Sequence, residues 1–580
     1  MATIQAKMSR GHKYWYIVES QRVNGKPRPV VLAYLGKPED LLKRLQGFCG
    51  HGKLKSYSHG GVCALLDVAR RLDIATVINE HVKSSRSYRA PKPIKNHLTV
   101  GMTIVLAAIG RVCMPTSKNR WANWVQTTSC GYLLHRNFSK LNSQHFWDMM
   151  DAVPVEAIEL IERQLLKKAF ELYKLDSDTL FFDTTNFFTF IDSTNQCCTI
   201  AQRGKNKQKR HDLRQVGMAM VVTREDMIPL FHLSYKGNLH DTKVSAGVIG
   251  KVKKRLTDLS LDIDSHTLVF DRGVNSKENL ALIKKLSMYY VGALTPSHHK
   301  HLITDASDNF QEIFVNDVPI QVFRDKRTIW NGERTVVVFL SENLKAGQLR
   351  GIYQSLEKKT KELRKLQLSL DRPTAKRQDK DKLQARIKQI IKGQFTTELI
   401  EWSLEQTTAG KFKLQFSLDQ QKLNELEDKL GFRILMTNRH NWETADIIKT
   451  YYGQSQVEQT FKNLKNPYHL AVRPQFHWTD QKIMVHNFIC VIGYLLSAII
   501  FRQAKAKADF TGTMNTLFDN LNNIRLAAVL TEPNSTGPAK ASYQLEQMSK
   551  SQQQLMCVLG IEDNHIRRPR FNGVGVYRKV

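Results

Sequence analysis

The sequence predicts a multidomain α/β protein built around a mixed β-sheet that is covered by helices. Its 580 residues, 42% of them hydrophobic, are enough to bury a sizeable core. Short apolar runs of buried-strand type recur between Thr179 and Thr295. Segments with helical periodicity separate several of these runs, and this alternation is typical of a sheet covered by helices.

The N-terminal part of the chain predicts a small β unit followed by helices. In residues 1–60, two strand-like runs meet at Asn24-Gly25, a dipeptide that favours a two-residue hairpin turn. Residues 61–175 carry apolar residues at three- and four-residue spacing, which indicates a helical region. A basic, proline-containing linker at 84–94 interrupts this region.

The rest of the chain predicts a core that is split by an insertion. Residues 176–297 contain three strand-like runs, then helix, strand, helix and strand, and form the first part of the core. Residues 298–431 hold strand-like runs and a charged helical hairpin interrupted at Pro373, and a stretch this long must itself be folded. The core resumes over 432–505, and 506–580 predict a C-terminal helical region with a basic tail.

The charge of the chain points to a polyanionic partner. With 86 Lys+Arg against 54 Asp+Glu, the net charge is +32, and basic side chains that displace counterions from phosphates gain binding free energy. We therefore expect a nucleic acid as the partner, with the helical region 61–175 among the parts that bind it. The alternative is that the charge serves solubility or that the chain is a ribosome-associated basic protein.

The compartment predicted by the sequence is the cytoplasm. The eight cysteines form no C-x-x-C pair and resemble no disulfide framework, which fits a reducing environment. The N-terminus lacks the apolar run of a signal peptide. The longest apolar runs, 100–110 and 488–501, are short for a bilayer span, so we expect buried helices and no membrane.

Two predicted strands end on an acidic residue, Asp183 in "LFFDTT" and Asp271 in "LVFDRG". In open α/β sheets, ligands bind at the carboxyl ends of the strands. Mg²⁺ prefers oxygen ligands and is often held by one or two carboxylates together with substrate phosphates. Two such ions at a phosphodiester would polarise the phosphorus and activate a water or a 3′-hydroxyl. The alternative interpretation is that each aspartate is an ordinary strand-end or turn residue.

A third carboxylate, Glu458, is predicted to lie on a helix over 451–465. At 100° per residue, a stripe about 60° wide holds one phenol, one amide, one carboxylate and one amine. These belong to Tyr451, Gln454, Glu458 and Lys465. Glu458 would ligate a metal, while Tyr451 and Lys465 would hold phosphate oxygens. Chance spacing on a solvated helix face is the alternative.

The spacing Y-x2-Q-x3-E-x6-K resembles the tyrosine–arginine–glutamate–lysine signature of bacterial insertion-sequence transposases, which have a DDE site and a ribonuclease H-like fold. Four further stretches are similar to one subgroup of this family, namely residues 114–129, 211–222, 228–242 and 472–496. The similarity covers about residues 10–505. It implies a ribonuclease H-like mixed sheet with flanking helices, interrupted by the β-containing and helical-hairpin insertion.

The resemblance also implies the site. Asp183, Asp271 and Glu458 would be the catalytic triad and would bind two Mg²⁺ ions, for which Mn²⁺ would substitute. Tyr451 and Lys465 would contact phosphate or DNA. The arginine of the signature is Gln454 here, which loses a bidentate grip on phosphate but keeps an amide able to hydrogen-bond.

Further DNA contacts are expected from basic residues. The acid-free stretch "RGKNKQKR" predicts a DNA-facing loop, with a solvated charged loop as the alternative. Arg272 follows Asp271 directly, and Arg473 matches a family position. The residues expected to contact DNA are therefore Tyr451, Gln454, Lys465, Arg272, Lys205, Lys207, Lys209, Arg210 and Arg473.

The function implied by the resemblance is that of a DNA transposase acting in the bacterial cytoplasm. As a homodimer, it would bind the terminal inverted repeats of an insertion sequence, cleave the ends and transfer the 3′-OH strands to target DNA. One alternative is a catalytically decayed transposase that only binds DNA, which Gln454 favours. Another is a metal-dependent nuclease of the same fold. The absence of G-x-x-x-x-G-K-[ST] disfavours a P-loop phosphotransferase.

Overall fold

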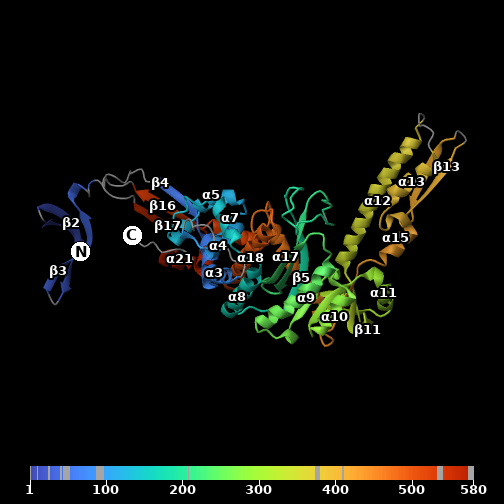
Figure 1. Cartoon of the computed structure of the whole chain (residues 1–580), viewed down its shortest axis with the longest axis horizontal. Coiled ribbons are helices and arrows are strands. Elements are labelled where there is room, and N and C mark those ends of the chain that lie inside the picture. The colour runs from blue at the N-terminus through green and yellow to red at the C-terminus, as the bar shows by residue number, and fades with distance from the viewer. Residues whose placement is uncertain are drawn as a thin grey trace. The chain divides into compact units, whose positions relative to one another are not determined.

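The computed structural model of the chain is mixed α/β, as predicted, and divides into two compact units (Figure 1). It describes residues 2–9, 11–23, 26–39, 42, 53–85, 97–206, 208–372, 379–407, 410–473, 475–531 and 540–572. Unit 1 comprises Met1–Asp67, Lys118–Ser143 and Gln503–Phe571. Unit 2 comprises Val68–Ser117, Gln144–Arg502 and Asn572–Val580.

Unit 1 contains two three-stranded antiparallel sheets. The first has the order β1-β2-β3, with β1 (Ala2–Ser9), β2 (His12–Val23) and β3 (Lys26–Gly36). The β2–β3 hairpin is confirmed, although Asn24-Gly25 lie outside the described residues. The second sheet has the order β17-β16-β4, with β4 (Lys53–Ser58), β16 (Arg525–Thr531) and β17 (Lys540–Leu545). The C-terminal region, which we expected to be helical, therefore also supplies two strands.

Helices make up much of the remaining structure outside the central sheet. Among those that belong to one unit alone are α3 (Ile74–Ser84), α4 (Val100–Cys113), α5 (Lys118–Gln126), α6 (Cys130–Leu134), α8 (Val155–Tyr173), α11 (Lys300–Ser307), α19 (Met514–Asn522), α20 (Lys550–Val558) and α21 (Ile561–Arg567). Helices α2 (Gly60–Arg71), α7 (Ser143–Asp151) and α18 (Asp480–Ala508) each contain a unit boundary.

Helix α18 is long and apolar enough to cross a membrane, with 29 residues and a mean hydropathy of 2.1 in its most apolar window. Of that window, 94% is buried inside the protein. The prediction of a buried helix is therefore confirmed, but the argument from length was wrong. The helix extends beyond the apolar run 488–501 at both ends, so its length alone does not exclude a span.

The centre of unit 2 is a nine-stranded sheet with the order β10-β11-β12-β15-β9-β8-β5-β6-β7. The pairs β5–β8 and β8–β9 are parallel, and the other pairs are antiparallel. The strands are β5 (Thr179–Phe188), β6 (Gln215–Thr223), β7 (Pro229–Lys236), β8 (Thr267–Phe270), β9 (Tyr289–Leu294), β10 (Gln311–Val315), β11 (Val318–Ile329), β12 (Gly332–Leu340) and β15 (Phe432–Thr437).

The connections explain why the parallel strands lie side by side. Parallel neighbours need a crossover, and helices provide it here. Helix α9 (Asp241–Asp258) leads from β7 to β8, and α10 (Lys277–Lys285) leads from β8 to β9. Every residue of β6 is buried, which accounts for its near-continuous apolar sequence. The predicted succession of three strands, helix, strand, helix and strand is present.

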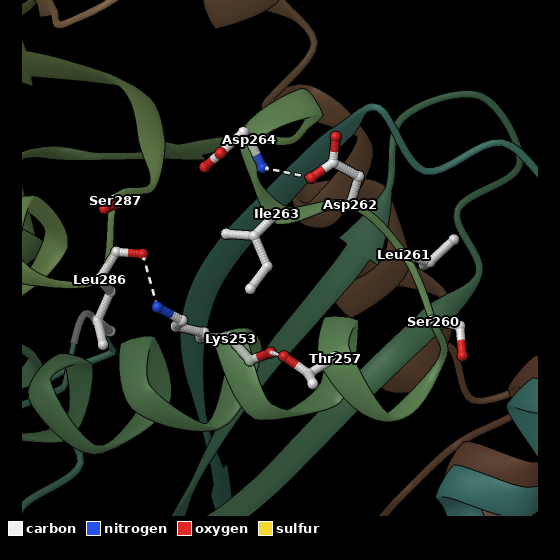
Figure 2. A pocket seen from close by; sticks show the side chains of 9 residues that line it. All are labelled: Lys253, Thr257, Ser260, Leu261, Asp262, Ile263, Asp264, Leu286 and Ser287. Carbon is white, nitrogen blue, oxygen red and sulfur yellow. Dashed lines mark hydrogen bonds between the residues drawn. The ribbon is translucent and has the colours of Figure 1, made fainter.

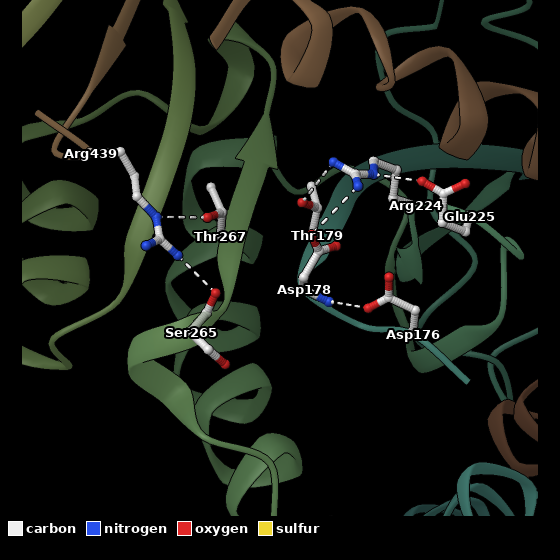
Figure 3. Close-up of polar contacts among 8 residues, drawn as sticks. All are labelled: Asp176, Asp178, Thr179, Arg224, Glu225, Ser265, Thr267 and Arg439. Atoms are coloured by element: carbon white, nitrogen blue, oxygen red, sulfur yellow. Dashed lines mark hydrogen bonds and ion pairs between the residues drawn. The ribbon is translucent and has the colours of Figure 1, made fainter. Parts of the chain in front are cut away.

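The amino ends of β5 and β8 are fixed by two arginines (Figure 3). Arg439 donates hydrogen bonds to Thr267 Oγ1 at 3.0 Å and to the Ser265 carbonyl at 2.8 Å. Arg224 donates to Asp178 Oδ2 at 3.4 Å, beside the first residue of β5. Hydrogen bonds to charged groups are among the stronger ones in proteins, so this edge of the sheet is firmly held.

Between β12 and β15 the chain forms a folded segment, which we call the arm (residues 342–430). Its elements are α12 (Glu342–Leu370), α13 (Lys380–Ile391), α14 (Thr396–Leu399), β13 (Ile400–Gln406), β14 (Phe412–Leu418) and α15 (Gln420–Glu427) (Figure 1). The arm has a hydrophobic cluster of its own, and it contains the predicted helical hairpin. Pro373 lies outside the described residues. Strands β10–β12, which fall within the predicted insertion, continue the central sheet instead.

Candidate active site

Asp183 and Asp271 occupy equivalent positions on neighbouring parallel strands. The register of β5 and β8 ends at the pair Phe182↔Phe270, and each aspartate is the next residue of its chain. The backbone of Asp271 is extended, with φ −85° and ψ 173°. Because side chains alternate between the faces and strands lie about 4.8 Å apart, the two aspartates project from the same face at the same level. Asp183 itself lies in the middle of β5, not at its end as predicted, because β5 continues beside β6 to Phe188.

Asp271 has long contacts and a half-exposed side chain. The Tyr451 hydroxyl donates to Asp271 Oδ1 at 3.3 Å, and Arg272 Nε lies 3.8 Å from the same oxygen. The side chain of Asp271 is 55% exposed. Its carboxylate therefore keeps lone pairs available for a ligand.

Tyr451 is a buried donor to Asp271 rather than an exposed DNA contact. It exposes only 6% of its surface. Burial, followed by the negative charge of Asp271, raises the pKa of Tyr451 to about 12, so the phenol keeps its proton. The hydroxyl can orient the Asp271 carboxylate, but it offers little surface for the contact that the sequence suggested.

The predicted single helix over 451–465 is wrong. The chain forms α16 (Thr444–Tyr452) and α17 (Ser455–Lys465), and Gly453 and Gln454 lie between them. The Gln454 N–H bonds to the Tyr451 carbonyl at 3.0 Å, a three-residue spacing that tightens the turn. Of the four residues predicted to share one helix face, only Glu458 and Lys465 lie together on α17.

Close packing accounts for the glycine between the two helices. A Cβ atom at Gly453 would lie 2.5 Å from Phe181 Cζ, so only glycine lets the chain come this close to β5. At the other end of α17, Lys465 Nζ donates to Thr185 Oγ1 and lies 5.5 Å from the centre of the Phe187 ring. The two contacts show that α17 runs along β5 in the direction of the strand.

Ideal rises put Glu458 about as far along α17 as Asp183 lies along β5. From Gly453 to Glu458 a helix rises about 7.5 Å, and from Phe181 to Asp183 a strand rises about 6.6 Å. Glu458 is exposed on α17. Within the described residues, however, no three or more His, Cys, Asp or Glu side chains are placed to hold a metal ion together. The predicted triad is thus not gathered into a three-ligand cluster.

The two aspartates by themselves fit a hard cation. They offer only oxygen donors, on one face and at one level of neighbouring strands. Mg²⁺ is commonly held by one or two carboxylates, with waters and substrate phosphates as the other ligands. The donor set therefore suits Mg²⁺ bound together with a phosphodiester.

Asp241 is a further carboxylate that the sequence analysis missed. It is the first residue of α9, and its Oδ1 accepts a hydrogen bond from Thr184 Oγ1 at 2.8 Å. A Cβ atom at Gly273 would lie 3.5 Å from Asp241 Oδ2. Asp241 thus lies between β5, next to Asp183, and the turn that follows Asp271. The stretch 228–242 contains it, and a search for every acid at a strand-to-helix junction would have found it.

The basic loop between β5 and β6 is exposed at the carboxyl end of β5. Lys205, Lys209 and Arg210 are exposed, and Lys207 lies outside the described residues. Arg210 donates to both oxygens of Asp212, at 2.8 and 2.6 Å, and this hydrogen bonding lowers the pKa of Asp212 to about 2. The guanidinium of Arg210 is therefore already engaged, whereas the two lysines extend into solvent.

The remaining predicted DNA contacts differ in their surroundings. Arg272 is half exposed beside Asp271, in the 3₁₀ turn Arg272–Val274. Arg473 is exposed, and its carbonyl accepts a hydrogen bond from the buried Arg111 at 3.0 Å, which fixes the backbone there. Gln454 is half-buried at the start of α17 and makes no side-chain cap.

A pocket of about 480 Å³ lies at the amino end of β8, opposite the end at which Asp271 follows that strand (Figure 2). It is lined by Lys253, Thr257, Ser260, Leu261, Asp262, Ile263, Asp264, Leu286 and Ser287. Lys253 Nζ donates to the Leu286 carbonyl at 3.1 Å, so the ammonium group already has a partner in the pocket wall. The pocket is remote from the carboxylates and is not part of the candidate site.

Comparison with known proteins finds a family model that matches part of the chain. Residues 188–475 match the family described as Transposase DDE domain, a segment that contains Asp271 and Glu458 and begins just after Asp183. The match supports a DDE transposase, with which DNA binding and magnesium are consistent. No curated protein matches the chain. A solved structure of the piggyBac transposase synaptic complex with hairpin DNA is similar over 79% of both chains, with 9% identity and a TM-score of 0.34. A likeness this low carries no argument about function.

Proposed function

We propose that this chain is a DDE transposase of the bacterial insertion-sequence type, with a ribonuclease H-like core formed by β5–β9. The observation that supports this most is the pairing of Asp183 with Asp271, one residue beyond the last register pair of two parallel strands. Helix α17, which carries Glu458, lies along β5. The match of residues 188–475 to a transposase DDE domain supports the same assignment.

In this proposal, Asp183, Asp271 and Glu458 hold two Mg²⁺ ions, and Mn²⁺ substitutes for them. When bound, such ions polarise the phosphorus and make water or a 3′-hydroxyl a stronger nucleophile. Tyr451 orients Asp271 through its hydroxyl. Lys465 and the exposed basic residues Lys205, Lys209, Arg272 and Arg473 hold DNA phosphates.

The proposed reaction has two steps. In the first, water attacks the phosphorus at the end of the element, and the P–O3′ bond breaks to leave a 3′-OH on the element and a 5′-phosphate on the flanking strand. In the second, that 3′-OH attacks a phosphodiester of the target, which forms a new P–O bond and releases a target 3′-OH. A homodimer in the bacterial cytoplasm would hold two terminal inverted repeats.

The test uses the full-length protein and duplex DNA that carries the terminal repeats flanking its own gene. The DNA is incubated with Mg²⁺ or Mn²⁺, and the strands are separated on a denaturing gel. We expect cleavage at the ends followed by joining to a target plasmid. Glu458→Gln should abolish both products, whereas Glu357→Gln, an exposed glutamate of α12, should leave them unchanged.

Each other outcome has a defined meaning. Equal cleavage by the wild type and Glu458→Gln would exclude Glu458 from the site. Binding of the correct end without cleavage would indicate a protein that only binds DNA. Cleavage without joining would indicate a nuclease.

A further inference from the structure

Three large aromatic side chains are exposed together at the carboxyl end of β5. Phe190 is 50% exposed, Phe476 60% and Trp478 65%. The rings of Phe190 and Phe476 lie 5.6 Å apart, and the Phe190 N–H bonds to the Gln475 carbonyl at 3.0 Å. Aromatic side chains bury large areas when the fold permits, so a cluster left in solvent calls for a ligand.

The backbone that carries two of these rings is fixed from the inside. Along 475–478, inward and outward side chains alternate, and the inward Gln475 and His477 are buried. Gln475 Nε2 donates to Asn487 Oδ1 at 2.8 Å, and the rings of His477 and His486 lie 4.4 Å apart. The backbone that carries the two outward rings is therefore held in place before any ligand arrives.

The loop that follows β5 is tied to the same segment. Asn195 Nδ2 donates to the Trp478 carbonyl at 3.2 Å, and Arg214 Nη1 donates to the Asn195 carbonyl at 2.9 Å. The Thr189 N–H bonds to the Arg214 carbonyl at 2.8 Å. The three exposed rings thus belong to one rigid surface formed by two segments far apart in the sequence.

Acidic and basic residues both flank these rings. The carboxylates of Asp192 and Asp480, each two residues from a ring, already accept hydrogen bonds, at 2.8 Å from the Thr194 N–H and at 2.7 Å from the Thr199 N–H. Exposed basic residues lie on the same segments. The β5–β6 pairing ends at Phe188↔Gln215, so the loop with Lys205 and Lys209 leaves from the same edge of the sheet. Arg473 is exposed three residues before Phe476. Positive charges that follow a phosphate backbone, together with aromatic faces on which bases stack, are the combination that binds single-stranded nucleic acid. A paired duplex hides its base faces, whereas an unpaired base offers one.

We propose that Phe190, Phe476 and Trp478 form a stacking surface for unpaired DNA bases. The inference rests on the proposed function in taking DNA as the ligand and Asp183 as part of the reacting site. Phe188 lies five residues beyond Asp183 along β5, about 17 Å away, which is the length of roughly five base pairs. The surface therefore receives bases that flank the reacting phosphodiester, not the base at the reacting phosphodiester itself.

The test measures binding of the full-length chain without divalent metal, by fluorescence anisotropy. The probes are a labelled oligodeoxythymidylate and a labelled blunt duplex of the same length. Phe476→Ala and Trp478→Ala should each weaken binding to the oligodeoxythymidylate about tenfold and binding to the duplex less than about twofold. Trp478→Phe, which keeps a ring, should retain most of the affinity. Tyr353→Ala, an exposed aromatic of α12, should change neither affinity.

Several results would overturn the inference. They are unchanged oligodeoxythymidylate binding in both alanine variants, an equal loss on both DNAs, or a change from dimer to monomer by sedimentation, which would mean that the rings cover a second copy. Circular dichroism and thermal midpoints establish that each variant is folded. If the wild type binds the duplex but not the oligodeoxythymidylate, this inference alone fails. If it binds neither, the proposed function fails.

Discussion

At the two ends of strands β5 and β8, the charged side chains of Arg439 and Asp271 differ in how close their partners lie. At the amino end, Arg439 makes hydrogen bonds of 3.0 and 2.8 Å, and its guanidinium lies 3.8 Å from the centre of the Tyr289 ring. At the carboxyl end, the contacts of Asp271 are 3.3 and 3.8 Å long, and more than half of its side chain is exposed. Arg439 therefore has close, well-oriented partners, whereas the contacts of Asp271 are long.

This difference leads us to expect that Arg439 stabilises the fold and that Asp271 takes part in the chemistry. A charged group whose partners are close and well oriented holds the fold together, because removing it leaves those partners unsatisfied. A carboxylate with long contacts keeps oxygen lone pairs for a cation or a phosphate-bound water. We therefore expect substitutions at the two ends to change different properties, and the predictions below test this in order of decreasing effect.

The largest effect is expected for Asp271→Asn. The loss of the charge should lower the rate of DNA cleavage by more than about a thousandfold, because metal-assisted charge stabilisation contributes several kcal/mol. The free energy of unfolding should change by less than about 0.5 kcal/mol, as for other exposed side chains. Asp178→Asn, at the amino end of β5, is the matched control and should leave cleavage unchanged. A large loss of stability in Asp271→Asn would erase the distinction between the two ends.

The converse is expected for Arg439→Ala. The loss of two hydrogen bonds and of the stacking on Tyr289 should lower the free energy of unfolding by about 2 kcal/mol. Urea denaturation followed by circular dichroism measures this value. Arg439→Lys keeps the charge but not the planar fork, and should fall between the wild type and the alanine variant. Unaltered stability with weakened DNA binding would place Arg439 in the functional part of the molecule.

Tyr451→Phe removes the donor to Asp271 and should slow cleavage about tenfold, the equivalent of one hydrogen bond of about 1.4 kcal/mol. The pKa of Tyr451 is raised from 10.0 to about 12, so the folded state favours the protonated phenol. This contribution to stability is complete below about pH 10 and is lost as the pH rises towards about 12. Unfolding measured across this range should therefore depend less on pH in the variant. A rate equal to that of the wild type would show that the phenol has no part in orienting Asp271.

The smallest effect is expected for Lys205→Ala combined with Lys209→Ala. If each lysine neutralises one phosphate, the slope of log K against log salt should fall by about 2, with a loss of affinity of only a few fold at moderate salt. Lys253→Ala, in the pocket at the amino edge, is the control and should leave the slope unchanged. A slope that falls equally in both proteins would show that the positive charge acts diffusely rather than from one edge.

Periodicity predicted the central strands and the aspartate pair well, because both depend on local sequence. The apolar runs that end in Asp183 and Asp271 become neighbouring strands, and the helical segments between the runs are the crossovers that parallel pairing requires. The position of Asp183 within β5 was missed, since β6 extends the ladder by pairing with residues that follow the aspartate.

What the sequence could not supply depends on contacts between distant segments. The stripe from Tyr451 to Lys465 has good helical spacing, and this local pattern does not reveal the break at Gly453, where the chain packs against the Phe181 ring, far away in sequence. The pairing of β4 with β16 joins segments more than 460 residues apart, which no local pattern encodes.

The place where the arm joins the sheet bears on how such proteins diversify. Its two ends meet at the register pair Leu340↔Phe432, so the strands that enter and leave it are already about 4.8 Å apart. A short turn could close that gap at little entropic cost, and the buried apolar residues from Ile352 to Leu430 form the arm's own cluster. Related proteins could therefore have a longer, different or missing arm, while the strands that carry the aspartates keep their register.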